Sequence, residues 1–215
     1  RWEKLMNSLL KFQEISSYKF KDVFILKEAL THRSYSAEHN LKYDNQRLEF
    51  LGDSVLQIIL TEHLFNLYKE FPEGQLTKIR SAIAQQESLA ILAREIRLGE
   101  ILYLGKGEIE TGGRDRDSTL ADAFEALLGA MYLDGGLESI RTYLMALITK
   151  HFPEPSELLQ DLNPKGTLQE YTQKFFNATP YYETVEVTGP DHNPSYTVKV
   201  FLKNQELGQG SATKR

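Results

Sequence analysis

The sequence predicts an all-α domain followed by a small α+β domain. From Trp2 to about Leu147 the apolar residues recur mostly at helical spacing. Two prolines in three residues, Pro153 and Pro155, then interrupt the pattern, because a helix cannot continue through them. Beyond them one helical stretch is followed by strand-like alternation. We therefore expect a first domain at 1–152, a linker at 153–161 and a second domain at 162–215.

Helical spacing in the first domain is clearest in two runs of apolar residues, which are Leu48, Leu51, Val55, Ile58 and Ile59, and Ala82, Leu89, Leu92 and Ile96. Glycine and proline mark the expected breaks at 71–74, 105–113 and 135–136. The second domain is predicted to contain a helix at 167–176 and strands at 181–188, 196–202 and 205–209, in the order α-β-β-β.

Composition narrows the chemistry that this chain can perform. Its 215 residues contain no cysteine, so disulfides, thiolate metal sites and cysteine nucleophiles are excluded. No apolar run approaches the roughly 18 residues of a membrane helix, and no signal-peptide pattern opens the chain. We expect a cytoplasmic protein without a membrane partner. Because the first residue is Arg1, the sequence is expected to begin inside a longer gene product.

The net charge of −5 would ordinarily argue against a nucleic-acid partner. From Leu162 onward, however, six basic residues face five acidic ones, so that part is slightly basic and the remainder strongly acidic. An acidic first domain suits a nuclease whose carboxylates bind cations before they accept phosphate.

A first pair of carboxylates stands on one face of a predicted helix. Glu49 and Asp53 are four residues apart, and Gln46 precedes Glu49 by three residues on the same face. Two like charges one turn apart repel each other unless a cation lies between them. The spacing therefore favours a cation site.

A second pair, Asp122 and Glu125, lies in a run that is otherwise uncharged and apolar from Leu120 to Leu133. Such a helix is buried, and buried carboxylates must be paired, protonated or bound to metal. Together the two pairs offer the hard oxygen ligands that Mg²⁺ prefers.

Simpler interpretations exist for each residue. Asp122 could close a capping box with Thr119 as N-cap, and Glu49 and Asp53 could lie on a solvated helix face. His32 could act as a general base, but a hydrogen-bonded structural role is favoured. No Ser/His/Asp constellation or glycine-rich phosphate loop is evident.

The stretch 47–54, Arg-Leu-Glu-Phe-Leu-Gly-Asp-Ser, resembles the signature segment of bacterial ribonuclease III. The stretches 29–35 and 120–136 resemble that family in the same order. The second domain resembles a double-stranded-RNA-binding domain at three short segments, which are 167–171, 189–192 and 208–211. The resemblance covers nearly the whole chain. It implies an all-α endonuclease domain followed by a small α+β domain of the α-β-β-β-α type.

By this resemblance, four carboxylates form a catalytic site that binds Mg²⁺, with Mn²⁺ as a substitute; they are Glu49, Asp53, Asp122 and Glu125. Asp53 and Glu125 are implied to be catalytic, and Glu73 matches a further acidic residue of the cleft. The family acts as a homodimer in which each subunit cuts one strand of double-stranded RNA, leaving 5′-phosphate ends and short 3′ overhangs. Phe50 matches an aromatic residue of the dimer contact, and the alternative is an ordinary core phenylalanine.

The second domain is implied to contact phosphates and 2′-hydroxyls of duplex RNA, since the bases of A-form RNA lie in a deep, narrow groove. The residues that match RNA-binding positions are Gln169, Glu170, Gln173, His192 and Lys214.

Two features depart from the family pattern. Gln46 stands where the family usually has Glu, which removes one negative charge from the cleft. The sequence ends at Arg215, where such domains start a last helix, so this helix is expected to be missing. The predicted function is cleavage of double-stranded RNA in the processing of rRNA precursors and mRNA. The alternative is a catalytically silent double-stranded-RNA-binding protein on the same fold.

Overall fold

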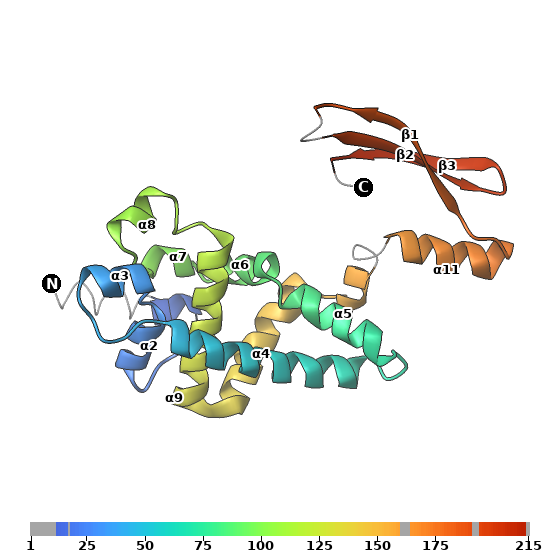
Figure 1. Ribbon diagram of the computed structural model, residues 1–215. Helices are drawn as coiled ribbons and strands as arrows, with labels where there is room; N and C mark the ends of the chain where they lie inside the picture. The colour runs from blue at the N-terminus through green and yellow to red at the C-terminus, as the bar shows by residue number, and fades with distance from the viewer. Residues whose placement is uncertain (1–11, 17, 160–163, 191–193, 214–215) are drawn as a thin grey trace. The chain divides into compact units, whose positions relative to one another are not determined.

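The computed structural model describes residues 12–16, 18–159, 164–190 and 194–213. The chain divides into two compact units, Arg1–Leu159 and Gln160–Arg215 (Figure 1). The first unit is helical and the second contains a three-stranded sheet. Both predicted architectures are confirmed.

The helical elements of the first unit include α2 (Val23–Ala29), α3 (Arg33–Glu38), α4 (Gln46–Leu67), α5 (Glu73–Ile83), α6 (Gln86–Glu95), α7 (Leu98–Ile101), α8 (Lys106–Glu110), α9 (Asp117–His151) and the 3₁₀ turn η1 (Pro155–Glu157).

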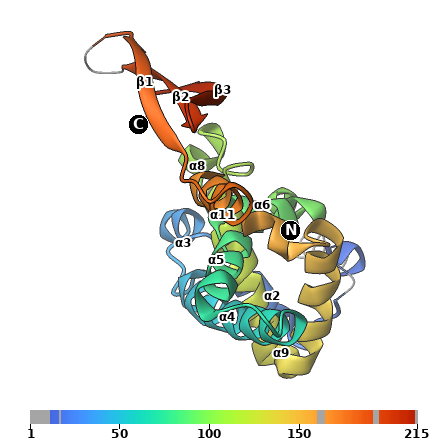
Figure 2. The same cartoon turned by 90° about the vertical axis from the view of Figure 1, so that its right-hand side faces the viewer.

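Helices α4 and α9 form the centre of this unit and pack against each other (Figures 1 and 2). Ile59 and Leu60 of α4 and Phe124 of α9 are completely buried between the helices of this core. Helix α9 changes direction at Gly136, whose φ of 78° and ψ of 178° are not helical. The break predicted at 135–136 is therefore present inside α9.

The two central helices approach closely through facing glycines. A Cβ atom at Gly52 of α4 would overlap the carbonyl oxygen of Glu125, and one at Gly129 of α9 would overlap that of Leu48. The backbones are therefore in direct contact at the level of the carboxylates. This contact fixes the position of Glu49 relative to Glu125.

Substitution Gly52→Ala is expected to destabilise the protein by about 2–3 kcal/mol, because the methyl group must push two backbones apart. Gly74→Ala is the matched control, since a Cβ atom there would meet nothing within 4 Å. Chemical denaturation of both variants tests this expectation. Equal stability of the two variants would show that the helices do not touch at Gly52.

The structure excludes the capping-box alternative for Asp122 and divides one of the two helical runs. Helix α9 begins at Asp117 with Arg116 as N-cap, so Thr119 lies inside the helix and cannot be the cap of a capping box. The run from Ala82 to Ile96 is divided between α5 and α6, because the chain leaves helical geometry at Gln85 (φ −72°, ψ 156°). Apolar spacing continues across this short break, which is why the sequence pattern conceals it.

The first part of the expected linker packs onto the helical unit. Pro155 is buried, and the backbone N–H of Ser156 donates to Tyr68 Oη at 3.0 Å. Residues 160–163 lie outside the described residues.

The second unit consists of α11 (Pro164–Phe176), β1 (Tyr181–Thr188), β2 (Ser195–Leu202) and β3 (Gln205–Ala212). The strands are antiparallel in the order β1-β2-β3. Lys203 and Asn204 both have positive φ, 48° and 68°, which makes a two-residue turn whose twist matches the strands it joins. β3 is the last element that the described residues contain, in agreement with the predicted α-β-β-β order.

Candidate functional site

Three carboxylates from two helices meet at the contact of α4 and α9. Glu49 lies in the first turn of α4, and Asp122 and Glu125 lie on consecutive turns of α9. One oxygen of each lies within 4.8 Å of the others. The predicted convergence of these three residues is therefore present in the structure.

The environment of these carboxylates opposes their negative charge. Burial is the main cause that raises the pKa of Glu125 to about 8, and the charges of Asp53, Glu49 and Asp122 add to it in that order. Burial also raises the pKa of Glu49, with Asp122 and Asp44 as further causes. The pKa of Asp122 is raised by burial as well, against an opposing effect of His32. A cation bound at this point would stabilise the negatively charged form of all three carboxylates.

Asp53 is placed at the side of this cluster. It lies one turn after Glu49 on α4 but is exposed, and it accepts a hydrogen bond from Gln57 Nε2 at 3.3 Å. It does not belong to the group within 4.8 Å. After burial, however, its charge is the largest cause of the raised pKa of Glu125, so the two side chains are neighbours.

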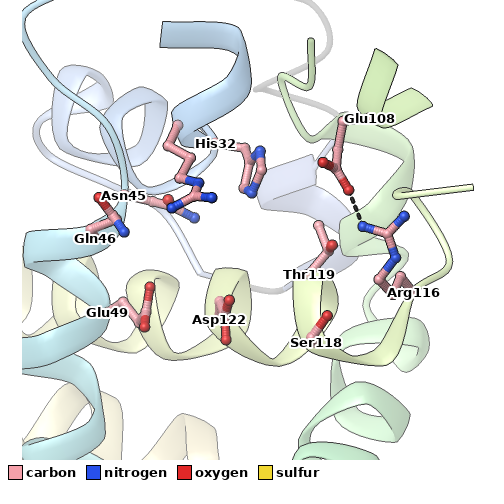
Figure 3. A pocket seen from close by; sticks show the side chains of 10 residues that line it. His32, Asn45, Gln46, Glu49, Glu108, Arg116, Ser118, Thr119 and Asp122 are labelled. Carbon is pink, nitrogen blue, oxygen red and sulfur yellow. Dashed lines mark hydrogen bonds and ion pairs between the residues drawn. The ribbon is translucent and has the colours of Figure 1, made fainter. Parts of the chain in front are cut away.

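A polar cavity of about 260 Å³ opens beside Glu49 and Asp122 (Figure 3). The start of α4 contributes Asn45 and Gln46 to its lining, so Gln46 lies beside the carboxylates as predicted from its spacing. The sequence did not single out several other lining residues, which are Arg33, Asn45, Glu108, Arg116 and Ser118. Glu108 and Arg116 come from the glycine-containing segment between α7 and α9, where no periodic pattern indicates which side chains face inward.

Long-range backbone pairing positions α3 above the cavity. Tyr103 N–H donates to the carbonyl of Leu30 at 2.9 Å, and His32 N–H donates to that of Tyr103 at 3.0 Å. Asn45 N–H donates to the carbonyl of Thr31 at 2.8 Å. These bonds hold the segment that precedes α3 between the start of α4 and the segment after α7.

His32 has the structural role that the sequence favoured, because it is the N-cap of α3. Its Nδ1 accepts from the backbone N–H of Ser34 at 3.3 Å. The same side chain also lines the cavity, which the sequence did not indicate.

Glu73 is the first residue of α5 and lies in a different place. Its side chain is exposed and accepts from Thr77 Oγ1 at 2.9 Å. It lines a second cavity together with Phe65, Phe71 and Arg80. A single chain therefore does not bring Glu73 to the cavity beside Glu49.

Phe50 is 80% exposed, so the alternative of an ordinary core phenylalanine is wrong. It follows Glu49 directly on α4. Ile58 and Phe65 of the same helix are 51% and 63% exposed, and all three side chains project from one side of the helix. We call these three residues the α4 apolar stripe.

Three of the residues matched to RNA-binding positions lie on α11 in the second unit. Gln169 and Gln173 are exposed, and Gln173 Nε2 donates to Asn177 Oδ1 at 3.3 Å. Glu170 belongs to the same helix. His192 and Lys214 lie outside the described residues.

Comparison with known proteins identifies both units. Residues 22–152 match the family model described as ribonuclease-III-like, and residues 164–215 match the double-stranded RNA binding motif. The chain belongs to the ribonuclease III family. Ribonuclease 3 of Campylobacter fetus is 43% identical over 206 residues, covering 95% of this chain and 90% of that protein. Ribonuclease 3 of Caldanaerobacter subterraneus is 47% identical over 195 residues, covering 90% and 86%.

The ribonuclease III fold is also matched by a solved structure. The nuclease domain of ribonuclease III from Campylobacter jejuni superimposes with a TM-score of 0.63 at 39% identity, covering 66% of this chain and 97% of that domain. That structure was described for flexibility in a region involved in dimer formation.

Membership in the ribonuclease III family makes this chain a double-strand-specific endoribonuclease with its own RNA-binding domain. The family is typically metal-dependent, and the three clustered carboxylates are consistent with that requirement. None of the helices within the described residues is both long enough and apolar enough to span a bilayer.

Proposed function

We propose that Glu49, Asp53, Asp122 and Glu125 form the catalytic centre, which binds Mg²⁺ and hydrolyses one strand of duplex RNA. Mn²⁺ would substitute for Mg²⁺. The observation that carries the proposal is the convergence of Glu49, Asp122 and Glu125 within 4.8 Å at the contact of two helices. The products would carry 5′-phosphate ends and short 3′ overhangs, and the substrates would be rRNA precursors and mRNA in the cytoplasm.

The residues fit a hard divalent cation. Every ligand offered is a carboxylate oxygen, which suits Mg²⁺ and does not suit a soft metal. The raised pKa of Glu125 shows that the protein alone does not neutralise the cluster. When bound, Mg²⁺ supplies positive charge that activates the attacking water and stabilises the phosphate.

The chain's own side chains orient the cation and hold a proton. In the metal-free protein at neutral pH, Glu125 keeps its carboxyl proton because its pKa is about 8. It gives up this proton when a cation binds, so cation binding strengthens as pH rises. Asp53 lies next to Glu125 and keeps an exposed carboxylate toward the solvent, from which water and substrate arrive. Because the chain contains no cysteine that could act as a nucleophile, water is the proposed nucleophile.

Gln46 and Glu73 are proposed as supporting residues of the cleft. Gln46 lines the cavity and can donate a hydrogen bond through its amide, which a glutamate cannot do. Glu73 would support the cleft of a dimer, since it lies away from the cavity of its own chain.

We also propose a homodimer in which each subunit cuts one strand, with Phe50 in the contact between subunits. The α4 apolar stripe supports this, because it exposes three large side chains along one side of the helix, of which Phe50 follows Glu49 directly. The domain bounds proposed are 1–152 and 162–215, with the linker between them. In the second domain, RNA contacts are proposed for Gln169, Glu170, Gln173, His192 and Lys214.

Cleavage of a long RNA duplex tests the proposed function. We expect Mg²⁺ and Mn²⁺ to support cutting of labelled double-stranded RNA, while single-stranded RNA of the same sequence stays intact. Ca²⁺ should permit binding without turnover, because its looser coordination positions water poorly. Mapping of product ends should give 5′-phosphates. Cutting in EDTA, or rapid cutting with Ca²⁺, contradicts the proposed metal role.

A silent RNA-binding protein on this fold is less well supported. All four carboxylates are present, and three of them meet in the structure.

A further inference from the structure

The two ring nitrogens of His32 have different hydrogen-bonding roles. Nδ1 lies 3.3 Å from the backbone N of Ser34 and 2.7 Å from its Oγ. A backbone N–H can only donate, so Nδ1 must accept and carries no proton. Ser34 Oγ itself accepts from the N–H of Gly105 at 2.9 Å, which leaves its hydroxyl proton for Nδ1. The neutral ring therefore carries its proton on Nε2.

The Nε2–H group faces the cavity rather than the core. Among the described residues, none accepts a hydrogen bond from it, while the ring lines the cavity together with Asp122. Figure 3 shows the ring across the cavity from Glu49 and Asp122. Burial is the main cause that lowers the pKa of His32. The charges that face it act in both directions, since Glu108, Asp122 and Asp44 raise the pKa and Arg33 lowers it.

Arg33 is the next residue along and also lines the cavity. Within the described parts of the chain, its guanidinium has neither an ion-pair partner nor a hydrogen bond. Arg116 on the same cavity differs, because it forms an ion pair with Glu108 and donates to Thr111. Arg33 is therefore the lining arginine whose charge is available to a bound anion.

We propose that His32 Nε2–H and the Arg33 guanidinium form a phosphate-binding subsite that holds a non-bridging oxygen of the RNA backbone beside the carboxylate cluster. This rests on the proposed function. Carboxylates repel a phosphodiester, so donors on the opposite wall are needed to hold the phosphate when the cation draws it in. The N-cap bond of His32 keeps the donor aimed at the cavity. His32 would thus contact substrate, besides capping α3.

Two substitutions of His32 separate these roles. His32→Asn keeps an acceptor near the Nδ1 position, so it can still cap α3, but it removes the donor at the Nε2 position. His32→Gln does the reverse, since its amide reaches the Nε2 position and leaves the cap poorly satisfied. We expect His32→Asn to melt like the wild type but to cut about tenfold to a hundredfold more slowly. His32→Gln should melt several degrees lower and cut within about threefold of the wild type.

The opposite order, with His32→Asn active and His32→Gln inactive, would show that His32 acts only as a cap and overturn the proposal. A measurement independent of activity is the ¹⁵N imidazole spectrum of the full chain. It should show the imidazole proton of His32 on Nε2. A proton on Nδ1 would also contradict the proposed subsite.

Arg33→Ala tests the second donor against Arg47→Ala, an exposed arginine of α4 that does not line the cavity. We expect Arg33→Ala to raise KM about tenfold and to reduce the salt dependence of RNA binding by about one charge, with a much smaller effect for Arg47→Ala. Equal effects of the two variants would remove Arg33 from the subsite. Wild-type protein and Glu125→Gln are measured in the same cleavage assay. Absence of Mg²⁺-dependent cutting by the wild type would refute the proposed function. Normal cutting by His32→Asn would refute only the subsite.

Discussion

Glu125→Gln is expected to lower the cleavage rate of duplex RNA by at least about 10³-fold, while RNA binding in Ca²⁺ stays close to that of the wild type. The substitution keeps the size of the side chain and removes the charge that the cation requires. Because Glu125 is the most strongly perturbed carboxyl of the cluster, with a pKa of about 8, the loss should exceed that of any neighbour. Single-turnover cleavage and filter binding measure the two effects separately.

The same substitution should stabilise the metal-free protein, and the effect should grow with pH. In the unfolded chain Glu125 ionises near its ordinary pKa of 4.5, whereas in the folded protein it holds its proton up to about 8. The folded state binds the extra proton, so stability is lost as pH rises between these values and the penalty is complete above 8. After allowance for solvent screening of a partly exposed group, the gain is about 1–3 kcal/mol at pH 8.5 and close to zero below pH 4.5.

Melting curves in EDTA at pH 5 and pH 8.5 measure this gain. Glu87→Gln, an exposed carboxyl of α6, is the matched control and should shift neither melting nor cleavage. A Glu125→Gln protein that melts like the wild type at pH 8.5 would show that the carboxylate is not strained in the empty site. Unchanged cleavage by this variant would refute the assignment of the catalytic centre.

Local spacing was sufficient to predict that each pair of carboxylates shares a helix face. Glu49 and Asp53 share a face because they are four residues apart, and Asp122 and Glu125 because they are three apart. The close contact of the two helices at Gly52 and Gly129 brings the two pairs together. A glycine in a helix does not by itself indicate which other helix will pack against it. The meeting was inferred from chemistry, since isolated like charges on a buried helix need a cation.

The cavity beside the carboxylate cluster depends on long-range backbone hydrogen bonds that no local sequence pattern predicts. His32 reaches it because Tyr103, far along the chain, is hydrogen-bonded to Leu30 and to His32 itself. Glu108 and Arg116 come from a segment with glycines and no periodicity. The location of Glu73 likewise depends on tertiary structure, and its predicted place in the cleft requires a second chain.

In the second unit, sequence and structure agree on element order and on the exact limits of the first strand, and differ at other ends. Strand β3 continues to Ala212, beyond the expected 209, because Gly208 and Gly210 pair with β2 although glycine is a poor strand former. Cross-strand pairing, and not intrinsic preference, extends this strand.

Phe50→Asp is expected to convert the protein from dimers to monomers, raising the dimer dissociation constant at least about a hundredfold. The Phe50 side chain is 80% exposed in a single chain, and exposing one large apolar side chain costs about 2 kcal/mol relative to burial. The α4 apolar stripe adds Ile58 and Phe65 along the same side of the helix, which is an arrangement typical of a protein contact. A charge at position 50 would have to be buried in the dimer contact without a partner.

Light scattering after size exclusion measures the mass of wild type and variant at equal concentration. Phe24→Asp is the matched control, because Phe24 is 69% exposed but lies on α2; this variant should remain dimeric. Circular dichroism should show both variants folded, since neither side chain belongs to the core. If Phe50→Asp has the mass of a dimer, Phe50 is not at the interface and the stripe needs another explanation. If it is a monomer, its cutting of a long duplex should fall sharply, because each chain supplies only one carboxylate cluster and paired cuts on opposite strands need two.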